Sequence, residues 1–263
     1  MNSVVLSDAQ RAAITDPVIR NVSALIPRPT AVDERGVARY LGAADAPVET
    51  DRFAADLAHN VSASDRLHAF DALQRDWRLE PLELGNTMPG FGDVRSGRRQ
   101  LLTLESTRTA GPRWVNQARA GFSQIAFDAQ QNVALKPADY GLDTGGHATS
   151  GLPAFNVAGA FNLGGPPNLP QARTDTTVLV SDDVSVTAGR HALKFGGEYR
   201  HFTYNAWFLD PGTLNLPGVA AFSSGTANSF SLILRRDHEH TLSARRFRFL
   251  AADSARVQVV VLR

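Results

Sequence analysis

The sequence predicts an all-β fold, in which about six to eight antiparallel up-and-down strands form part of a transmembrane β-barrel. Long extracellular loops and a short helix near the N-terminus complete it. Three observations predict this fold. Apolar and polar residues alternate with a period of two between residues 50 and 205. Four-residue turns join the strands in pairs, and much longer loops separate the pairs. Long strands with short turns at one end and long loops at the other are typical of outer-membrane barrels, whereas soluble sandwiches have shorter strands.

Composition limits the classes of function. The 263 residues carry a net charge of +1, so no global field attracts nucleic acid. Cysteine is absent, which excludes disulfides, thiolate catalysis and cysteine metal sites. There is no apolar run near the roughly 18 residues that a spanning helix needs, so any crossing of a membrane must use strands. The start of the chain, MNSVVLSDAQ, has no features of a secretory signal.

Three segments are expected along the chain: residues 1–49 as a loop segment with a short helix, residues 50–234 as the partial barrel, and residues 235–263 as an atypical tail. The helix is expected to begin at Asp16-Pro17 and to end before Pro27, because proline favours the first helical position and stops a helix further on.

Three hairpins make up the predicted barrel segment. The first has its turn at 62–65, and the second joins strands at 98–107 and 114–127 through a turn at 110–113. The third runs from Thr174 to Asn205 with a turn at 187–190. The loops at 78–98, 128–173 and 205–234 separate or follow these hairpins.

The third hairpin divides its side chains between two faces. A lysine or arginine that faces lipid at mid-bilayer costs about 2–4 kcal/mol, so the charged side must face a watery lumen. The expected lumen-facing residues are Lys194, Glu198 and Arg200, and the expected lipid-facing residues are Leu193, Phe195 and Tyr199. Asp71 does not fit this pattern, because it falls on the expected lipid side of the first hairpin.

Several short stretches resemble one known family. NTMPGFGD (86–93), Val115-Asn116, FNLGGPPNLPQ (161–171) and GRHALKFGGEYR (189–200) resemble the barrel region of TonB-dependent outer-membrane receptors, and most closely the Oar-like branch, over about residues 6–234. The resemblance implies a location in the cell outer membrane. It also implies uptake or binding of an unknown small ligand, contact with outer-membrane lipid, and the TonB system and a plug domain as partners in the intact protein. It implies no cofactor. The chain is then expected to be an interior fragment of a barrel of about 22 strands.

The resemblance ends near Leu234. Residues 235–263 hold seven arginines, at 235, 236, 245, 246, 248, 256 and 263, where a further lipid-facing strand is expected. This change in composition suggests a frameshift or a misread gene end, and it underlies the expectation of an atypical tail.

The remaining motifs favour ordinary structural roles. His238-Glu239-His240 lacks a third metal ligand, and Asp182-Asp183 would point to opposite faces of a strand. The arginine cluster lacks the interleaved aromatic residues of a nucleic-acid site, so no nucleic-acid partner is expected. No nucleophile with a base is evident, and no enzymatic activity is expected. Two alternatives stay open: a soluble β-sandwich that binds carbohydrate or protein, and a small autonomous eight-stranded barrel with enzymatic activity.

Overall fold

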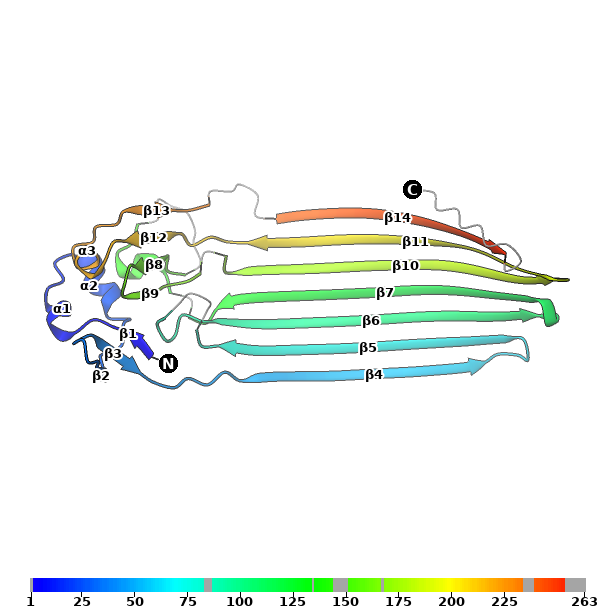
Figure 1. The fold of residues 1–263 in the computed structure, drawn as a ribbon, viewed down its shortest axis with the longest axis horizontal. Coiled ribbons are helices and arrows are strands. Elements are labelled where there is room, and N and C mark those ends of the chain that lie inside the picture. Colours follow the sequence, from blue (N-terminus) through cyan, green and yellow to red (C-terminus); the bar gives the residue numbers. More distant parts are fainter. Residues whose placement is uncertain are drawn as a thin grey trace.

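The computed structural model describes residues 2–82, 87–133, 135–143, 151–166, 168–233 and 239–253. It has two parts, a long antiparallel sheet and a folded head at one end of that sheet (Figure 1). The sheet has seven strands in the order β14-β11-β10-β7-β6-β5-β4. Strands of this sheet that follow one another along the chain are neighbours in space throughout, as expected for an up-and-down fold.

The long strands are β4 (Val48–Asn60), β5 (Asp65–Glu80), β6 (Asp93–Ala110), β7 (Trp114–Gln131), β10 (Gln171–Ala188), β11 (His191–Phe208) and β14 (Glu239–Asp253). Four of them have 18 residues. At about 3.3 Å per residue such a strand is roughly 60 Å long, whereas about 9–11 residues suffice to cross a bilayer. The sheet therefore extends well beyond the thickness of a membrane.

The three predicted hairpins are β4–β5, β6–β7 and β10–β11, and their turns all lie at the end of the sheet opposite the head (Figure 1). The third turn is tighter than expected. Ala188 pairs with His191, so Gly189 and Arg190 alone form the connection rather than residues 187–190. Gly189 has a φ of 58°, a conformation that two-residue hairpin turns require and that glycine adopts without steric cost.

The arginine-rich segment differs from the expected tail. Glu239–Asp253 forms β14, which pairs with β11 from Trp207↔Glu239 to Leu193↔Asp253. The stretch RFRF (246–249) explains the difference, because its arginines and phenylalanines alternate and so fall on opposite faces of a strand, although Arg245 shares the face of the phenylalanines. The frequency of arginine therefore hides an ordinary strand pattern. Residues 234–238 and 254–263 lie outside the described residues.

The N-terminal segment is more structured than the predicted loop with one helix. It holds β1 (Asn2–Val4), α1 (Asp8–Ala12), α2 (Pro17–Ser23), β2 (Ala31–Val32) and β3 (Ala38–Leu41), and its strands form a small sheet. Helix α2 begins where predicted, because Asp16 accepts a hydrogen bond from the backbone N–H of Ile19 at 2.9 Å. Helix α1 begins with a capping box between Ser7 and Gln10, a signal that the proline-based reading missed.

Arg11 joins the two helices of this segment. Its guanidinium donates to the carbonyl oxygens of Ser23 and Ile26 at 2.9 Å and of Pro27 at 2.6 Å. These carbonyls belong to the last residue of α2 and to residues just after it, where backbone acceptors lack partners within the helix. Burial lowers the pKa of Arg11, although the group stays charged at any physiological pH.

The remaining elements of the head come from segments expected as long loops. They are η2 (Pro137–Tyr140), β8 (Ala154–Val157), β9 (Phe161–Leu163), β12 (Thr213–Leu216), α3 (Val219–Ser223) and β13 (Ser229–Ser231). The short strands form a four-stranded sheet in the order β13-β12-β8-β9, in which β12 and β8 are parallel.

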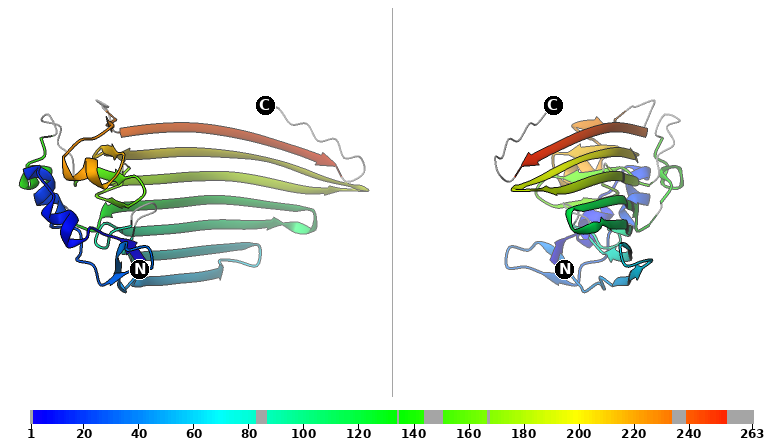
Figure 2. Two further views of the ribbon diagram at one scale, coloured as in Figure 1. Left: turned by 60° about the vertical axis from the view of Figure 1, so that its left-hand side comes forward. Right: turned by 90° about the vertical axis from the view of Figure 1, so that its right-hand side faces the viewer.

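The hydrophobic core lies in the head and not on the long sheet. Its centre is Phe222, which is fully buried and makes edge contacts with Phe155 and Phe161 at ring-centroid distances of 6.3 and 5.4 Å. Among the described residues, Ala129 is the only buried hydrophobic residue that belongs to the seven long strands. The rotated views in Figure 2 show the long sheet as one open, curved layer, which differs from the β-sandwich alternative.

The head and the sheet are expected to respond differently to loss of a core side chain. Phe222→Ala should destabilise the head by about 3–5 kcal/mol, because it removes a fully buried aromatic ring. The measurement is the rate of limited proteolysis within the head. Phe230→Ala is the control, because Phe230 is exposed on β13, and equal rates for the two variants would contradict the assignment of the core.

Candidate functional site

The candidate site is a whole face of the long sheet, and the strand register defines it. Partners in adjacent antiparallel strands point to the same side. One row across all seven strands is entirely apolar, and it consists of Leu57, Ala69, Leu104, Ala120, Val180, Tyr199 and Phe247. The adjacent row points to the other side and consists of Ala58, His68, Glu105, Arg119, Ser181, Glu198 and Arg248. We call these sides the apolar face and the charged face.

Ion pairs concentrate on the charged face. In the described part of the sheet this face has eight ion pairs: His68–Asp56 (2.7 Å), Arg78–Glu80 (3.4 Å), Arg95–Asp93 (2.5 Å), Arg99–Asp76, Arg119–Glu105 (2.8 Å), Arg173–Asp175 (3.1 Å), Lys194–Asp183 (3.6 Å) and Arg200–Glu198 (2.6 Å). Within the described part of the sheet, the apolar face has two pairs, Arg108–Asp65 and His191–Asp253. Both lie near the hairpin turns.

The residues predicted from the third hairpin fall on the two faces as groups. Lys194, Glu198 and Arg200 lie on the charged face, where Glu198 accepts two hydrogen bonds from Arg200, at 2.6 and 3.0 Å. Leu193, Phe195 and Tyr199 lie on the apolar face, where they oppose Val186, Val184 and Val180. Phe195 is 48% exposed although it is apolar, because nothing in the described chain covers this face.

Strand β14 contributes to both faces, and the sequence reading missed it. Arg246 and Arg248 oppose Arg200 and Glu198 on the charged face. The ring of Phe247 lies 4.9 Å from that of Tyr199 on the apolar face. The signal that could have found these residues is the alternation of arginine and phenylalanine.

Two carboxylates near the middle of the apolar face, away from the head and the turns, have neutral amide partners. Asp71, which the pattern left unexplained, is within 3.4 Å of the side-chain nitrogen of Gln100. Asp182 accepts a hydrogen bond from Asn116 at 2.5 Å. These amides donate hydrogen bonds to the carboxylates in place of arginine partners. They thereby lower the free-energy cost of placing Asp71 and Asp182 on the apolar face.

Tryptophan occurs at three positions, Trp77, Trp114 and Trp207, and all three lie on the apolar face. Trp77 and Trp207 belong to one row near the head, which passes through Ala172 of β10. Trp114 belongs to a row near the turns, which passes through Val186 of the same strand. The two rows are 14 residues apart on β10 (172 to 186), or about 46 Å along the strand.

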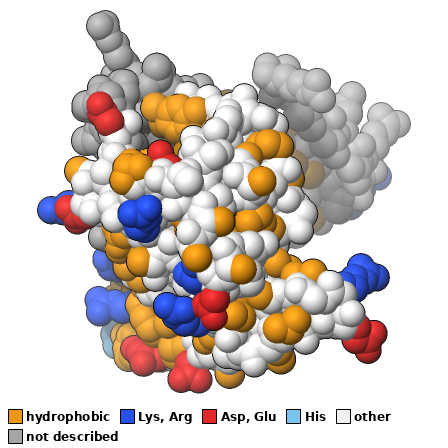
Figure 3. Space-filling model, turned by 90° about the vertical axis from the view of Figure 1, so that its left-hand side faces the viewer, with side chains coloured by type: hydrophobic (Ala, Val, Ile, Leu, Met, Phe, Trp, Pro, Cys, Tyr) orange, Lys and Arg blue, Asp and Glu red, His pale blue; other side chains and the backbone are white. Residues whose placement is uncertain are grey.

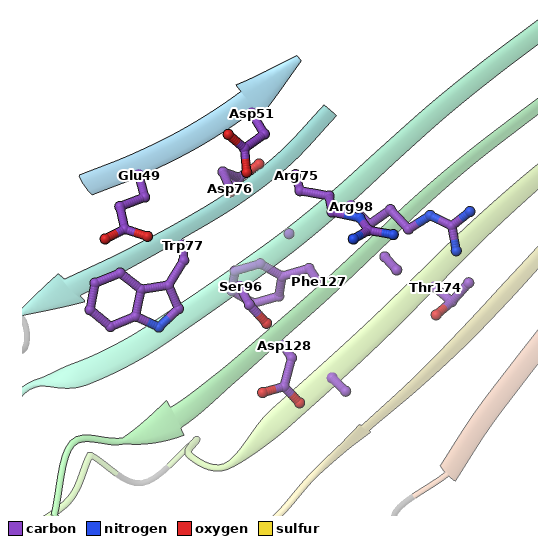
Figure 4. Close-up of a pocket in the computed structure, with 13 residues that line it drawn as sticks. Glu49, Asp51, Arg75, Asp76, Trp77, Ser96, Arg98, Phe127, Asp128 and Thr174 are labelled. Carbon is purple, nitrogen blue, oxygen red and sulfur yellow. The ribbon is translucent and has the colours of Figure 1, made fainter. Parts of the chain in front are cut away.

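At the end of the sheet near the head, the side that carries the apolar face has polar and charged side chains instead. A hollow of about 490 Å³ lies there, and Figure 4 shows Glu49, Asp51, Arg75, Arg98 and Asp128 around it together with Trp77. Asp51, Arg75 and Arg98 are successive partners across β4, β5 and β6. The apolar part of this face is therefore a band with a charged border on the side of the head.

Residues 7–255 match the family described as outer membrane beta barrel domain. The match covers most of the chain, including β14, and the chain belongs to this family. Its long sheet is part of a transmembrane β-barrel, and the protein is located in the outer membrane. Among the described residues, no helix has the length and apolar character needed to cross a membrane.

A solved structure with a similar arrangement is the outer membrane transporter YddB from Escherichia coli, with 8% sequence identity and a TM-score of 0.48. The similarity covers 88% of this chain and 30% of that chain, so the present sequence spans less than a third of that protein's length. No curated protein matches the sequence.

Two motifs for which the sequence favoured structural roles lie at least partly within the described residues. Of His238-Glu239-His240, His238 lies outside them. No group of three or more histidine, aspartate or glutamate side chains in the part of the chain that the structure describes is arranged to hold a metal ion. Asp182 and Asp183 lie on opposite faces, as the strand pattern predicts, and have separate partners, Asn116 and Lys194.

The charged face is expected to tolerate loss of some ion pairs better than others. Asp93 is fully buried and bonded to Arg95 at 2.5 Å, so Asp93→Asn should cost about 1.5–3 kcal/mol. The side chains of Glu198 and Arg200 are 22% and 40% exposed, so Glu198→Gln should cost less than about 1 kcal/mol. Urea unfolding in lipid vesicles measures both costs. A larger cost for Glu198→Gln would contradict this ranking.

Proposed function

We propose that this chain is part of the barrel of a TonB-dependent outer-membrane receptor of the Oar-like type, which binds a small ligand and carries it inward. In this proposal the apolar face contacts lipid and the charged face lines the lumen. The proposed partners in the intact protein are a plug domain, the TonB system and outer-membrane lipid, with no nucleic acid. We propose transport or binding rather than enzymatic catalysis.

The observation that carries the proposed orientation is the separation of tryptophans from ion pairs. All three tryptophans lie on the apolar face, whereas eight ion pairs lie on the other. Barrel strands tilt by about 35–45°, so the roughly 46 Å between the tryptophan rows corresponds to about 33–38 Å across the membrane. The hydrocarbon core is about 30 Å thick, and tryptophan prefers its two interfaces with water.

The charged face is suited to line a watery lumen. Its acids and bases alternate across strands, as in the row from His68 through Glu105 and Arg119 to Glu198. A surface of paired charges stays hydrated and has no strong net field, so polar ligands can pass over it. If this face contacted lipid instead, each unpaired charge near the bilayer centre would cost about 2–4 kcal/mol.

Cysteine labelling tests the orientation, because the chain has no cysteine and each introduced thiol reports one position. In outer membranes, a single cysteine at 194 or 198 should react with a water-soluble maleimide, because these positions line the lumen. One at 193 or 195 should resist that reagent and be quenched by a lipid-borne probe. If cysteines at the even positions 194 and 198 and at the odd positions 193 and 195 reacted equally with the water-soluble reagent, the proposed orientation would be contradicted.

A folding measurement complements the labelling. Val180→Arg should destabilise the barrel in lipid by about 2–4 kcal/mol, because Val180 lies on the apolar face about midway between the two tryptophan rows, where an arginine would contact acyl chains. Lys194→Ala should have little effect on folding. Both variants are compared by urea unfolding in vesicles, and equal costs would argue that the two faces have the same environment.

Cross-linking tests the TonB assignment directly. Cells that produce the receptor are treated with a short cross-linker, and antibodies against this chain recover the complex. TonB and a plug-containing polypeptide should be present, and antibodies against a porin from the same cells should recover neither. Recovery of this chain without TonB in repeated experiments would overturn the proposal of TonB dependence.

A further inference from the structure

We propose that the four-stranded sheet of the head binds an uncharged saccharide through a row of asparagine side chains. This inference rests on the proposed function, since it identifies the class of ligand that the receptor takes. The site is a hollow of about 460 Å³, within the range of small-molecule sites. Four asparagines contribute to its lining, namely Asn156, Asn162, Asn215 and Asn228.

The strand register places three of these asparagines in one row. Asn162 of β9 opposes Asn156 of β8, and Asn156 opposes Asn215 of β12. The row continues to Ser229 of β13, so it crosses the whole sheet. The residues next to them in sequence, such as Phe155 and Leu216, are buried in the core of the head. The asparagines therefore occupy the face of the sheet that is turned away from the core.

Hydrogen bonds along the row hold the amide groups in fixed orientations. Asn156 donates its side-chain N–H to the side-chain oxygen of Asn215 at 3.1 Å, and Asn215 donates to the hydroxyl of Ser229 at 3.1 Å. Within the described part of the chain, the side-chain oxygen of Asn156 and the whole side-chain amide of Asn228 have no hydrogen-bond partner. They provide both acceptors and donors for a ligand.

The surroundings of the row are free of charge. Residues 151–170 and 211–233, which supply all four strands and α3, contain no aspartate, glutamate, lysine, arginine or histidine. Figure 3 looks at the head end-on and shows white and orange side chains over the centre of the surface, with charged side chains along its left and lower margins. Anionic ligands are usually recognised by arginine or lysine, and cations by carboxylates, so neither fits this site.

A saccharide fits the chemistry that is present. Its hydroxyl groups donate and accept hydrogen bonds, and an asparagine amide does both. The C–H surfaces of a sugar ring are apolar, and the lining supplies small apolar groups at Ala158, Ala160 and Pro217. Strands β8 and β12 belong to the head, which lies at the end of the barrel opposite the short turns (Figure 1).

Binding of defined oligosaccharides to the full chain in detergent tests the proposal. The probes are gluco-, xylo- and chito-oligosaccharides as neutral ligands, and oligogalacturonate and sialylated oligosaccharides as anionic ones. We expect the wild-type chain to bind at least one neutral series and not the anionic ones. Asn228→Ala should weaken binding about fivefold, and Asn156→Ala with Asn228→Ala should weaken it more than tenfold.

The variants separate loss of binding from loss of folding. Asn228 makes no side-chain hydrogen bond to the described protein, so its truncation leaves the head intact, which limited proteolysis verifies. Asn60→Ala is the matched control, because Asn60 is an exposed strand asparagine near a hairpin turn. Neutral binding that falls in the head variants and not in the control supports the proposal.

Three results would overturn the inference: no binding of any neutral probe, tighter binding of the anionic probes, or equal affinities for wild type and head variants. Because the assay needs neither TonB nor a membrane potential, these results leave the TonB assignment unaffected. Conversely, saccharide binding without TonB in the cross-linked complex would overturn the proposed function and not the site.

Discussion

The structure depends on an uninterrupted backbone register across seven strands. Every two neighbouring strands of the long sheet pair residue by residue without a break. Within a strand, whether a residue number is odd or even therefore decides the face on which the side chain lies. A shift of one residue in any strand would move its charges onto the apolar face and its apolar residues onto the charged face. The separation of ion pairs from tryptophans therefore exists only while all six strand pairs hold their register.

This constraint also explains where the hydrophobic core lies. A sheet in a barrel wall has lipid on one side and water on the other, so it needs no second layer of protein. The long strands accordingly contribute little to the buried core, and the head contributes nearly all of it. The head is thus organised as a soluble protein is, with aromatic residues such as Phe222 at its centre. The head buries its apolar side chains inside the protein, whereas the long sheet leaves many of them exposed on one face.

Local signals in the sequence were sufficient for the hairpins, the parity of the third hairpin and the start of α2. Each depends on residues that are close together along the chain, such as Asp16 with Pro17 or Phe195 beside Lys194. The sheets of the head could not be predicted in this way. Strand β8 pairs in parallel with β12, whose residues lie 59 positions further on (154 to 213), and neither strand has more than four residues. The asparagine row is a product of that long-range pairing.

The arginine-rich strand shows a different limit of prediction from sequence. Its arginine content was given more weight than the alternation of residue types along it. Seven arginines in 235–263 suggested a segment foreign to a barrel, although Phe247 and Phe249 have the parity of the apolar face. Arginine is unfavourable in a barrel strand only when it faces lipid. Arg246 and Arg248 lie instead beside Glu198 on the charged face, where their charge is compatible with water, and Arg245 is the exception that opposes His201 on the apolar face.

The edges of the sheet have a consequence for the intact protein. Strands β4 and β14 are the outer strands, and they do not pair with each other. In hydrocarbon each unpaired backbone group costs several kcal/mol, so an open edge cannot stay in contact with lipid. Both edges must therefore meet further strands when the sheet is in a membrane, whether those strands belong to the same polypeptide or to another. In the orientation that we propose, a barrel wall closed in this way would present the charged face inward along its whole height, and the head would stand at one end of the resulting channel.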